Sequence, residues 1–414
     1  MKRIAVIFEG RLHDQMGVFN AVMQRVRHLR DIAQGCAIDV HMIEGYDRGL
    51  NRWLHGTRRI ADRPAVAHID TGDVRPEGRG AGAGGLDEGI DVQVHWFCHS
   101  LMDTVRHKVL HRPALSYRRW LSRLADGLQG YDLLSAHDRI AGTAAAMAGH
   151  RYGMPHYITW HGHSIHSDAA TDPVYRAATI ELLQHATCNF FVSRGLERFA
   201  RETLCDEFRS EVLYNGASPA FFRYDEVRRR ALRHQRGIGD DERVVGFVGR
   251  MDAVKNVTLL DDLFDEVSRL YHGGLHFVAV GDGPLHDQVR QLLHERGIRC
   301  LMPGAVPYAQ MPDWMNCIDV LVLPSQKEGL PLVTLEAIQC GANVVATDVM
   351  GTAEAVGQDN AVALDGALVE NMARRAVQML RGEVVQQLPA AMSWVATARR
   401  EWEIYQAEPR ARHC

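Results

Sequence analysis

Two cations in the second half of the chain have the spacing of a phosphate-binding pair. Arg250 and Lys255 stand five residues apart in the run GRMDAVKN, which follows a short apolar run ending at Val248. At the end of a strand, an arginine can hold a diphosphate through two parallel hydrogen bonds, and a lysine adds a point charge. A pair of solvated loop cations is the alternative interpretation of these two residues taken alone.

Two carboxylates follow in the run EGLPLVTLE, where we expect a helix to begin at Pro331. Proline is tolerated in the first helical turn because its missing N–H has no intrahelical partner there. The backbone N–H groups from Leu330 to Val333 are then available to a phosphate. Glu328 precedes this helix, and Glu336 lies inside it among apolar neighbours. A carboxylate buried there needs hydrogen-bond donors, and the two hydroxyls of a ribose would supply them.

The elements that must position these residues are predicted by an alternation along the whole chain. Short apolar runs rich in Val, Ile and Phe alternate with helical patterns, which is typical of βα units around parallel sheets. Ligands of such sheets bind in the loops that follow the strands. The second half offers three loops of this kind: GRMDAVKN, GDGPL and PSQKEGLPLV. Predicted strands include Arg3 to Phe8, His156 to Trp160, Arg243 to Gly249 and Leu275 to Val280.

The length of 414 residues exceeds what one hydrophobic core usually supports, so two domains are expected. The stretch from Tyr224 to Asp241 is charged and lacks strand character, which places a boundary between residues 1–223 and 224–390. Residues 391–414 are expected to form a last helix and a tail. The predicted fold class is α/β, with two Rossmann-like doubly wound domains facing a central cleft.

Composition excludes several classes of partner. The 47 Lys and Arg against 51 Asp and Glu give a formal net charge of -4, so no global basic field attracts nucleic acid. The 8 cysteines show no CxxC pair or metal-type spacing, and we expect reduced thiols in a cytoplasmic protein. No apolar run has the length of a signal-peptide core or of a membrane span.

Basic residues do cluster locally, at residues 23–30, 106–119 and 228–236. We expect each cluster to be a solvated helix face, and the alternative is contact with anionic lipid headgroups. Any association with the inner face of the membrane is therefore expected to be peripheral.

Three stretches of the second half resemble the donor domain of retaining GT-B glycosyltransferases, specifically glycosyltransferase family four, also called glycosyl transferases group 1. They are VVGFVGRMDAVKN, VAVGDGPL and VLPSQKEGLPLVTLEAIQCGANVVATDVMGTAEAV. The first half resembles the family more loosely, through YDLLSAHDRIAGTAAAMAGHRYGMPHYITWHGHS, FFVSRGLERF and VLYNGASPAFF. The resemblance implies that Arg250 and Lys255 bind the donor diphosphate. It also implies that Glu336 binds the ribose and Glu328 the transferred sugar near its 3- and 4-hydroxyls.

The same resemblance assigns further site residues. It places His161 of the WHG segment beside the sugar and Gly17 near the phosphates, although Gly17 stands alone where the family often has two adjacent glycines. We expect Glu328, His161, Arg250 and Lys255 to be catalytic. The expected donor-binding residues are Gly17, Arg250, Lys255, Gly281, Val306, Glu328, Gly329, Leu330, Pro331, Leu332 and Glu336. No metal is expected, because His163 and His166 lack carboxylate or thiol partners at ligand spacing.

The resemblance also fixes the expected domain roles. Residues 1–223 would be the acceptor-side domain, residues 224–390 the nucleotide-sugar-binding domain, and the helix of 391–414 would return to the first domain. The glycine-rich stretch of residues 72–87 is interpreted as a mobile loop or disordered insertion, with a lid over the acceptor side as the alternative.

The expected activity is transfer of a sugar from a UDP- or GDP-linked donor with retention of its anomeric configuration. The nucleotide sugar is the co-substrate, and no cofactor is expected. Attack on the same face of the sugar would let the donor's own phosphate oxygen accept the acceptor's proton. A sugar or lipid-linked glycan of the bacterial cell surface is the expected acceptor. The alternatives are a sugar-nucleotide epimerase or phosphorylase of the same architecture and a non-catalytic sugar-nucleotide-binding partner subunit.

Overall fold

The computed structural model describes residues 1–12, 17–47, 63–69, 89–99, 101, 105 and 115–407. The glycine-rich stretch 72–87 and the tail 408–414 lie outside these residues. The described chain forms two compact units. We call them the first unit, which runs to Leu213 and resumes at Trp394, and the second unit, Tyr214–Ser393.

The change of unit falls earlier than the predicted boundary at residue 224. The side chain of Asn215 explains the difference, because its Nδ2 donates a hydrogen bond of 3.1 Å to the carbonyl oxygen of Leu330. Tyr214 likewise donates through its hydroxyl to Glu354 at 2.8 Å. Residues that follow the last strand of the first sheet are therefore already bonded within the second unit.

The first unit is built on an eight-stranded sheet of order β3-β4-β2-β1-β5-β6-β7-β8. Its strands pair in parallel except β3, which runs antiparallel to β4 at one edge and was not predicted. The strands are β1 (Arg3–Glu9), β2 (Ala37–Asp47), β3 (Val66–Ile69), β4 (Ile90–His99), β5 (Leu133–His137), β6 (His156–Trp160), β7 (Cys188–Phe191) and β8 (Ser210–Val212).

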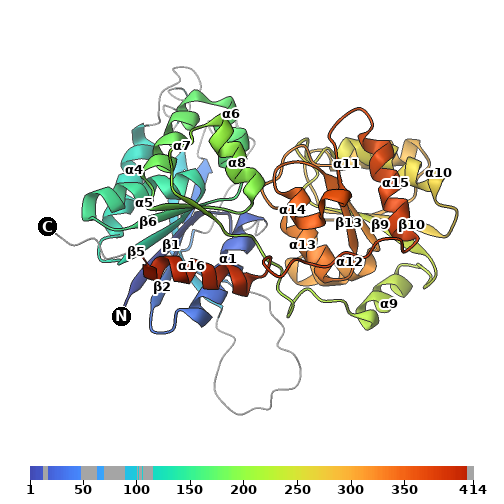
Figure 1. Cartoon of the computed structure of the whole chain (residues 1–414), viewed down its shortest axis with the longest axis horizontal. Helices are drawn as coiled ribbons and strands as arrows, with labels where there is room; N and C mark the ends of the chain where they lie inside the picture. The colour runs from blue at the N-terminus through green and yellow to red at the C-terminus, as the bar shows by residue number, and fades with distance from the viewer. Residues whose placement is uncertain are drawn as a thin grey trace, which may run out of the picture. The chain divides into compact units, whose positions relative to one another are not determined.

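Side chains of β1 alternate between the two faces of this sheet, as the two-residue period of a strand requires. Ile4, Val6 and Phe8 belong to one core cluster with residues of α1 (Val18–Ile32) and α16 (Trp394–Ala407). Ala5 and Ile7 belong to the other cluster, with residues of α4 (Leu115–Gly127) and α5 (Asp138–Tyr152). Helices therefore cover both faces of the sheet (Figure 1). Further described helices of this unit are α6 (Ala169–Thr171), α7 (Pro173–His185) and α8 (Arg194–Thr203), with a π-helical turn at Ser164–Asp168.

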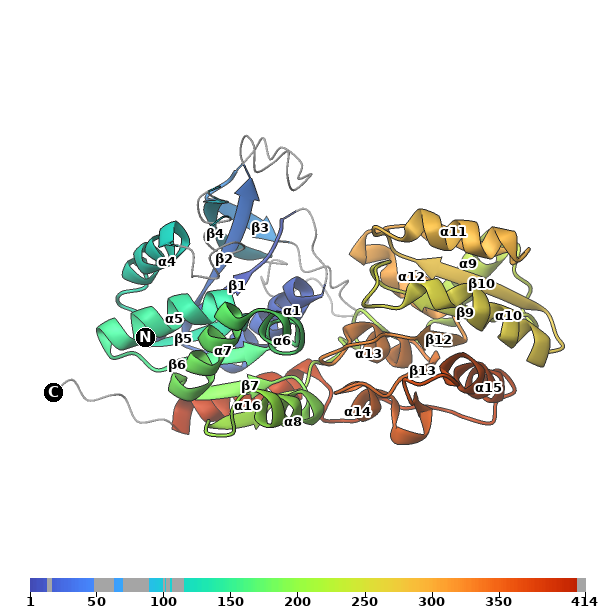
Figure 2. The same ribbon diagram turned by 90° about the horizontal axis from the view of Figure 1, so that it is seen from above.

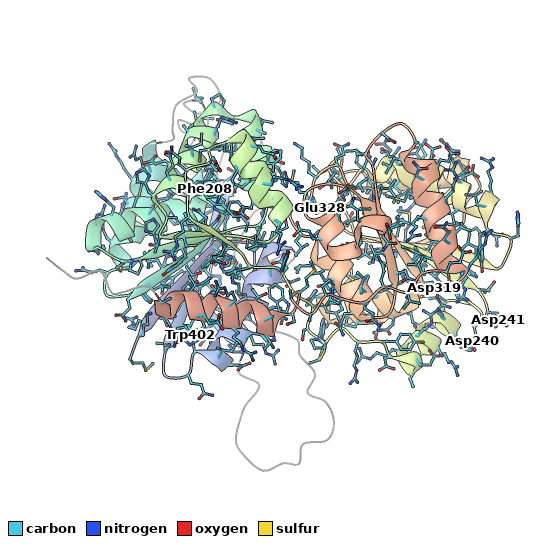
Figure 3. All side chains as sticks on the ribbon, in the orientation of Figure 1. Phe208, Asp240, Asp241, Asp319, Glu328 and Trp402 are labelled. Carbon is cyan, nitrogen blue, oxygen red and sulfur yellow. The ribbon has the colours of Figure 1, made fainter. Side chains whose placement is uncertain are left out.

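The last helix, α16, packs against α1, and the two lie side by side in Figure 1. Trp394 is buried, and Trp402 packs partly against the core (Figure 3). Arg25 of α1 forms a buried ion pair with Glu401 of α16, whose other carboxylate oxygen accepts a hydrogen bond from Tyr405. The chain thus returns to the first sheet after completing the second unit.

The second unit contains a fully parallel six-stranded sheet of order β11-β10-β9-β12-β13-β14 (Figure 2). Its strands are β9 (Arg243–Val248), β10 (Leu275–Val280), β11 (Cys300–Gly304), β12 (Val320–Leu323), β13 (Asn343–Thr347) and β14 (Ala361–Val362). Its helices are α9 (Glu226–Gln235), α10 (Leu260–Leu270), α11 (His286–Glu295), α12 (Met311–Cys317), α13 (Leu332–Gln339), α14 (Thr352–Val356) and α15 (Leu368–Leu380).

Two arginines of the basic cluster at residues 228–236 bind a carboxylate at the sheet, which the sequence did not indicate. Asp319, labelled in Figure 3, accepts from Arg233 at 2.6 Å, from Arg229 at 2.5 Å and from the backbone N–H of Val244 at 2.7 Å. The side chain of Arg233 is only 1% exposed. For these two arginines the solvated-face and lipid interpretations are both wrong, because the side chains tie α9 to the sheet. Across the described residues, no helix combines the length and apolarity that crossing a membrane requires.

Candidate functional site

The strand order of the second sheet brings the three predicted loops together. β9 has β10 on one side and β12 on the other, so the chain reverses its direction of progress through the sheet at β9. Ligands of open α/β sheets bind outside the carboxyl ends of the strands at such a reversal. The backbone N–H of Met251 donates to Asp282 at 3.0 Å, and that of Gln326 donates to Val254 at 2.8 Å. All three loops are therefore connected by backbone hydrogen bonds.

The closest approach between two of these loops requires glycine at position 281. A Cβ added to Gly281 would lie 1.9 Å from the carbonyl oxygen of Gly249, and the residue has a φ of +131°. Because the obstructing atom belongs to the backbone, no side-chain rotation can relieve the contact. Gly281 thus sets the distance between the loops GRMDAVKN and GDGPL.

We expect Gly281→Ala to destabilise the protein by about 1–3 kcal/mol or more, because it combines backbone strain with a steric clash. Thermal unfolding measures the effect. Gly297→Ala is the matched control: Gly297 has a φ of +70°, and a Cβ there would meet nothing within 4 Å. If the two variants lost the same amount of thermal stability, the contact between the loops would not constrain position 281.

Lys255 and Glu328 meet across two of the loops. The Nζ of Lys255 lies 2.5 Å from Oε1 of Glu328, and the side chains are 22% and 9% exposed. Glu328 lies in the loop before α13 (Figure 3). Asp252 holds the first loop in shape, since its carboxylate accepts from the backbone N–H of Lys255 at 3.1 Å. A cation suited to phosphate and a carboxylate suited to sugar hydroxyls are thereby placed in contact.

Arg250 occupies the same loop and is more exposed than Lys255. Its Nε lies 3.4 Å from Oδ2 of Asp252, and its side chain is 52% exposed. The carboxylate of Asp252 therefore contacts both residues: one oxygen lies near the guanidinium of Arg250, and the other accepts a hydrogen bond from the backbone N–H of Lys255.

Glu336 is buried in α13, with 7% of its surface exposed. Burial raises the pKa of its carboxyl group to about 7, and a hydrogen bond of 3.1 Å from the hydroxyl of Tyr308 acts in the opposite direction. The ring of Tyr308 stacks on Phe221, with centroids 5.2 Å apart. The sequence interpretation missed Tyr308, although it follows the predicted site residue Val306 by two positions, and Val306 is half-buried.

The turn before α13 differs slightly from its prediction. The helix begins at Leu332, and Pro331 caps it with an extended ψ of 121° instead of forming its first turn. Gly329 and Leu330 precede this cap, and the carbonyl oxygen of Leu330 is bound by Asn215. The first N–H groups of a helix have no intrahelical partner, so this end of α13 still presents donors at the carboxyl edge of the sheet.

In the first unit, His161 follows β6 and is held by the last residue of β5 and the first residue of α5. Its Nε2 lies 2.9 Å from Nδ1 of His137, with the rings stacked at 5.2 Å. Its backbone N–H donates to Oδ1 of Asp138 at 3.2 Å. Burial lowers the pKa of His161 to about 3 and lowers that of His137 well below its usual range. Both rings are therefore neutral at physiological pH.

The first unit also has a pocket at the carboxyl edge of its sheet, with a volume of about 360 Å³. Charged and polar side chains from several elements line it, among them Glu9, Arg11, His137, Asp138, Arg139, His163 and Asp168. Sequence interpretation did not single out Glu9, Asp138, Arg139 or Asp168. The available signal was that Glu9 directly follows one predicted strand, Arg3 to Phe8, and that Asp138 comes two residues after another, Leu133 to Ala136. Gly17 has a φ of 56° and directly precedes α1, two of whose residues, Val18 and Phe19, line this pocket.

Taken together, the predicted residues fall into two groups. The structure gathers Arg250, Lys255 and Glu328, with Gly281, at adjoining loops of the second unit, and places Glu336 in the helix that follows. His161 and Gly17 belong to the first unit. Within the described ranges, no group of three or more His, Cys, Asp or Glu side chains is placed to hold a metal ion.

Comparison with known protein families gives two matches along the chain. Residues 228–399 match the family of glycosyl transferases group 1, and residues 74–216 match the glycosyl transferase 4-like domain. The stretches on which the resemblance was based lie mainly within these two ranges.

Two curated relatives and one solved structure show the extent of the similarity. TuaC of Bacillus subtilis strain 168, a glycosyltransferase named for teichuronic acid biosynthesis, is 29% identical over 232 residues, which are 55% of this chain. The chain thus spans 56% of the length of TuaC. The D-inositol 3-phosphate glycosyltransferase of Streptosporangium roseum is 25% identical over 400 residues, 88% of this chain and 83% of that protein.

The structure of HepE from Anabaena in complex with UDP and glucose matches with a TM-score of 0.65 at 16% identity. The match covers 98% of this chain and 100% of HepE. At this identity the likeness concerns the fold. With the two largely parallel sheets described above, it confirms the predicted α/β fold class of two Rossmann-like units.

Proposed function

The chain belongs to the glycosyl transferases group 1 family of GT-B fold, and on that premise we propose that it is a retaining hexosyltransferase. It moves a sugar from a UDP- or GDP-linked donor to a sugar or lipid-linked glycan acceptor. The reaction serves the synthesis of a bacterial cell-surface polysaccharide or glycolipid. The name of TuaC and the UDP and glucose bound in HepE support this proposal.

The observation that carries the proposal is the contact between Lys255 and Glu328 at 2.5 Å. Departure of a nucleoside diphosphate requires fixed positive charge at the leaving phosphate. Lys255 supplies this charge, Arg250 adds to it, and Glu328 orients the transferred sugar through its hydroxyls. In the ligand-free protein Lys255 and Glu328 already lie in contact, and we place the junction of the donor's phosphate and sugar there.

His161 acts as a hydrogen-bonding group toward the sugar. Its pKa of about 3 makes it neutral, so it does not serve as a general acid in the cationic form. Its Nε2 is bound to His137, which leaves Nδ1 as the ring nitrogen for a sugar hydroxyl. Proton transfer from the acceptor is accordingly assigned to the donor's phosphate oxygen.

The experiment that tests this proposal supplies UDP- and GDP-linked hexoses in the absence of an acceptor. We expect slow hydrolysis of one donor, with release of its nucleoside diphosphate. Proton NMR should show the released sugar first in the anomeric configuration of the donor. A first product of inverted configuration would contradict retention, and stability of every donor in the presence of folded protein would contradict the transferase proposal.

Glu336 makes nucleotide binding depend on pH. Ribose hydroxyls donate to its ionised carboxylate, so binding favours the deprotonated form, and the pKa of this group is about 7. We therefore expect the affinity for the sugar nucleotide to fall as the pH falls below about 7, by up to about tenfold per pH unit. Calorimetric titration between about pH 6 and pH 8 measures how the affinity changes with pH. The Glu336→Gln variant should bind the nucleotide more weakly, and its affinity should not change with pH in this range.

The Glu336→Gln variant should weaken nucleotide binding, but it should increase the stability of the ligand-free protein. The pKa of Glu336 is raised in the folded protein above its usual value of 4.5, so folding is disfavoured as the pH rises from 4.5 to about 7. Glu336→Gln should therefore stabilise the ligand-free protein at pH 8, by up to about 3 kcal/mol. Loss of both nucleotide affinity and stability would point to misfolding and contradict a ribose-binding role.

We further propose that the protein works in the cytoplasm and that α4 supports a peripheral contact with the membrane. Arg118, Arg119 and Arg123 of this helix are exposed, and its other face packs on the core through Leu121 and Leu124. Clustered cations near an anionic surface contribute about 1 kcal/mol each. Cosedimentation with phosphatidylglycerol vesicles, compared with phosphatidylcholine vesicles, tests this contact in the wild type and in the triple alanine variant.

A further inference from the structure

Tyr308 contributes a hydroxyl to the buried carboxylate of α13. It begins the 3₁₀ turn Tyr308–Gln310, which follows β11, and its hydroxyl donates to Oε1 of Glu336 at 3.1 Å. Within the described part of the chain, this is the hydrogen bond that the side chain of Glu336 accepts. A carboxylate has about four acceptor positions, so Oε2 and a second position on Oε1 remain for the two ribose hydroxyls.

Two phenylalanines hold the ring of Tyr308 in place. Phe221 stacks on it, with centroids 5.2 Å apart and planes at 26°, and Phe222 meets it at 70° with centroids 5.7 Å apart. Both phenylalanines are buried, and their backbone N–H groups donate to the carbonyl oxygen of Ser218. The aromatic packing therefore fixes the ring, and the ring fixes the position of the hydroxyl beside Glu336.

The carboxylates on the helices packed against α13 already have partners. Asp313 of α12 forms an ion pair with Arg228 at 3.4 Å. Glu354 of α14 accepts the hydrogen bond from Tyr214. The strand β13, which also packs against α13, has no ionisable side chain. Among the described residues, no cation acts on the pKa of Glu336.

The hydrogen bond from Tyr308 instead favours the ionised form of Glu336. Burial raises the pKa of this carboxyl group to about 7, and the hydrogen bond acts against the rise, because a donor stabilises the charged carboxylate. The thiols of Cys317 and Cys340 have pKa values raised by burial, so they add no charge at physiological pH. Loss of the hydroxyl would therefore leave a larger fraction of Glu336 protonated at neutral pH.

We propose that Tyr308 is a positioning residue of the nucleotide site: its hydroxyl holds the carboxylate of Glu336 in the orientation and the charged form that accept the two ribose hydroxyls. Nucleotide binding thereby extends to a lower pH than Glu336 alone would allow. This inference rests on the proposed function, because it takes Glu336 as the ribose-binding group.

The test compares Tyr308→Phe with the wild type by calorimetric titration at several pH values, using UDP or GDP, whichever the wild type binds. Phenylalanine keeps the stacked ring and removes the hydroxyl. Loss of one hydrogen bond to a charged group should shift the pH dependence upward by about one unit. The Kd of the variant divided by that of the wild type should be less than about 2 at about pH 8.5, about 5 at about pH 7 and about 9 at about pH 6. Because both proteins are compared at the same pH, titration of the nucleotide itself cancels in this ratio.

Two further variants control the experiment. Tyr271→Phe removes a hydroxyl between α10 and β10, at the amino edge of the same sheet, and its Kd should match the wild type at every pH. In a Glu336→Gln background, Tyr308→Phe should no longer give a Kd ratio that changes with pH, because the two residues act through one contact.

A Kd ratio that stays constant over this pH range, or that falls toward low pH, would overturn the inference, since a purely structural residue weakens binding equally at every pH. The Glu336→Gln variant separates this inference from the proposed function. If it binds more weakly than the wild type and the ratio for Tyr308→Phe is constant, only the role of Tyr308 fails. If the wild type binds neither nucleotide, or Glu336→Gln binds as tightly as the wild type, the ribose-binding role fails first and the role of Tyr308 fails with it.

Discussion

Replacement of Lys255 by alanine is expected to lower the rate of sugar transfer by about 10²–10³-fold, the usual effect of removing one group that stabilises developing negative charge. The Nζ of Lys255 lies 2.5 Å from Glu328, in the loop that follows β9. Without this cation, the leaving diphosphate loses a fixed positive charge, and Glu328 adds a repulsive charge to the site. Steady-state kinetics of donor consumption measure the loss.

Two further variants show whether the loss belongs to the site. Arg290→Ala removes an exposed cation on α11 of the same unit and should change the rate less than threefold. Glu328→Gln combined with Lys255→Ala should cost much less than the product of the single effects, because residues in contact act as a unit. A Lys255→Ala enzyme within threefold of the wild type would remove Lys255 from the mechanism.

Glu401→Ala is expected to lower the free energy of unfolding by about 3–5 kcal/mol. Glu401 of α16 forms an ion pair with Arg25 of α1, and the two side chains are only 2% and 4% exposed. Removal of the carboxylate leaves a buried guanidinium that water cannot reach. Urea-induced unfolding followed by far-UV circular dichroism measures the difference.

The control for this experiment lies on the same helix. Glu403 pairs with Arg400 at 3.3 Å, but its side chain is 55% exposed, so Glu403→Ala should cost at most about 1 kcal/mol. The double variant Arg25→Met with Glu401→Leu removes both buried charges and should recover most of the lost stability. Equal losses in Glu401→Ala and Glu403→Ala would show that burial of the pair does not matter.

The regular strands could be predicted from the sequence because they are continuous apolar runs bounded by polar residues. The predicted ranges of β6 and β10 coincide with the observed ones, His156–Trp160 and Leu275–Val280. β3 was missed because a short edge strand has little apolar surface to bury. β11 was missed because its residues, CLMPG, end in proline and glycine, which usually indicate a turn. Pro331 was placed in the first turn of α13 because proline's missing N–H is tolerated there. Its φ of -70° suits a helix, but its ψ of 121° does not.

The two site regions differ in how far sequence could predict them. Arg250, Lys255, Glu328 and Glu336 lie in loops and a helix whose local patterns are informative, and the structure adds the contact between residues 255 and 328. Their roles in binding and catalysis remain predictions. The pocket of the first unit is lined by Glu9, Asp138 and Asp168, which belong to β1, α5 and the π-helical turn at Ser164–Asp168. No local pattern relates such residues, and the reversal of strand order brings them together.

The central claim is that the second unit binds a nucleotide through its phosphates, and thermal unfolding in the presence of UDP and GDP tests it most directly. A ligand present at about 100 times its Kd stabilises a folded protein by about 2.7 kcal/mol. We expect one of the two nucleotides to raise the unfolding temperature of the wild type and to leave that of Lys255→Ala unchanged. If neither nucleotide stabilises the folded wild-type protein at saturating concentration, the second unit does not bind a nucleotide as proposed.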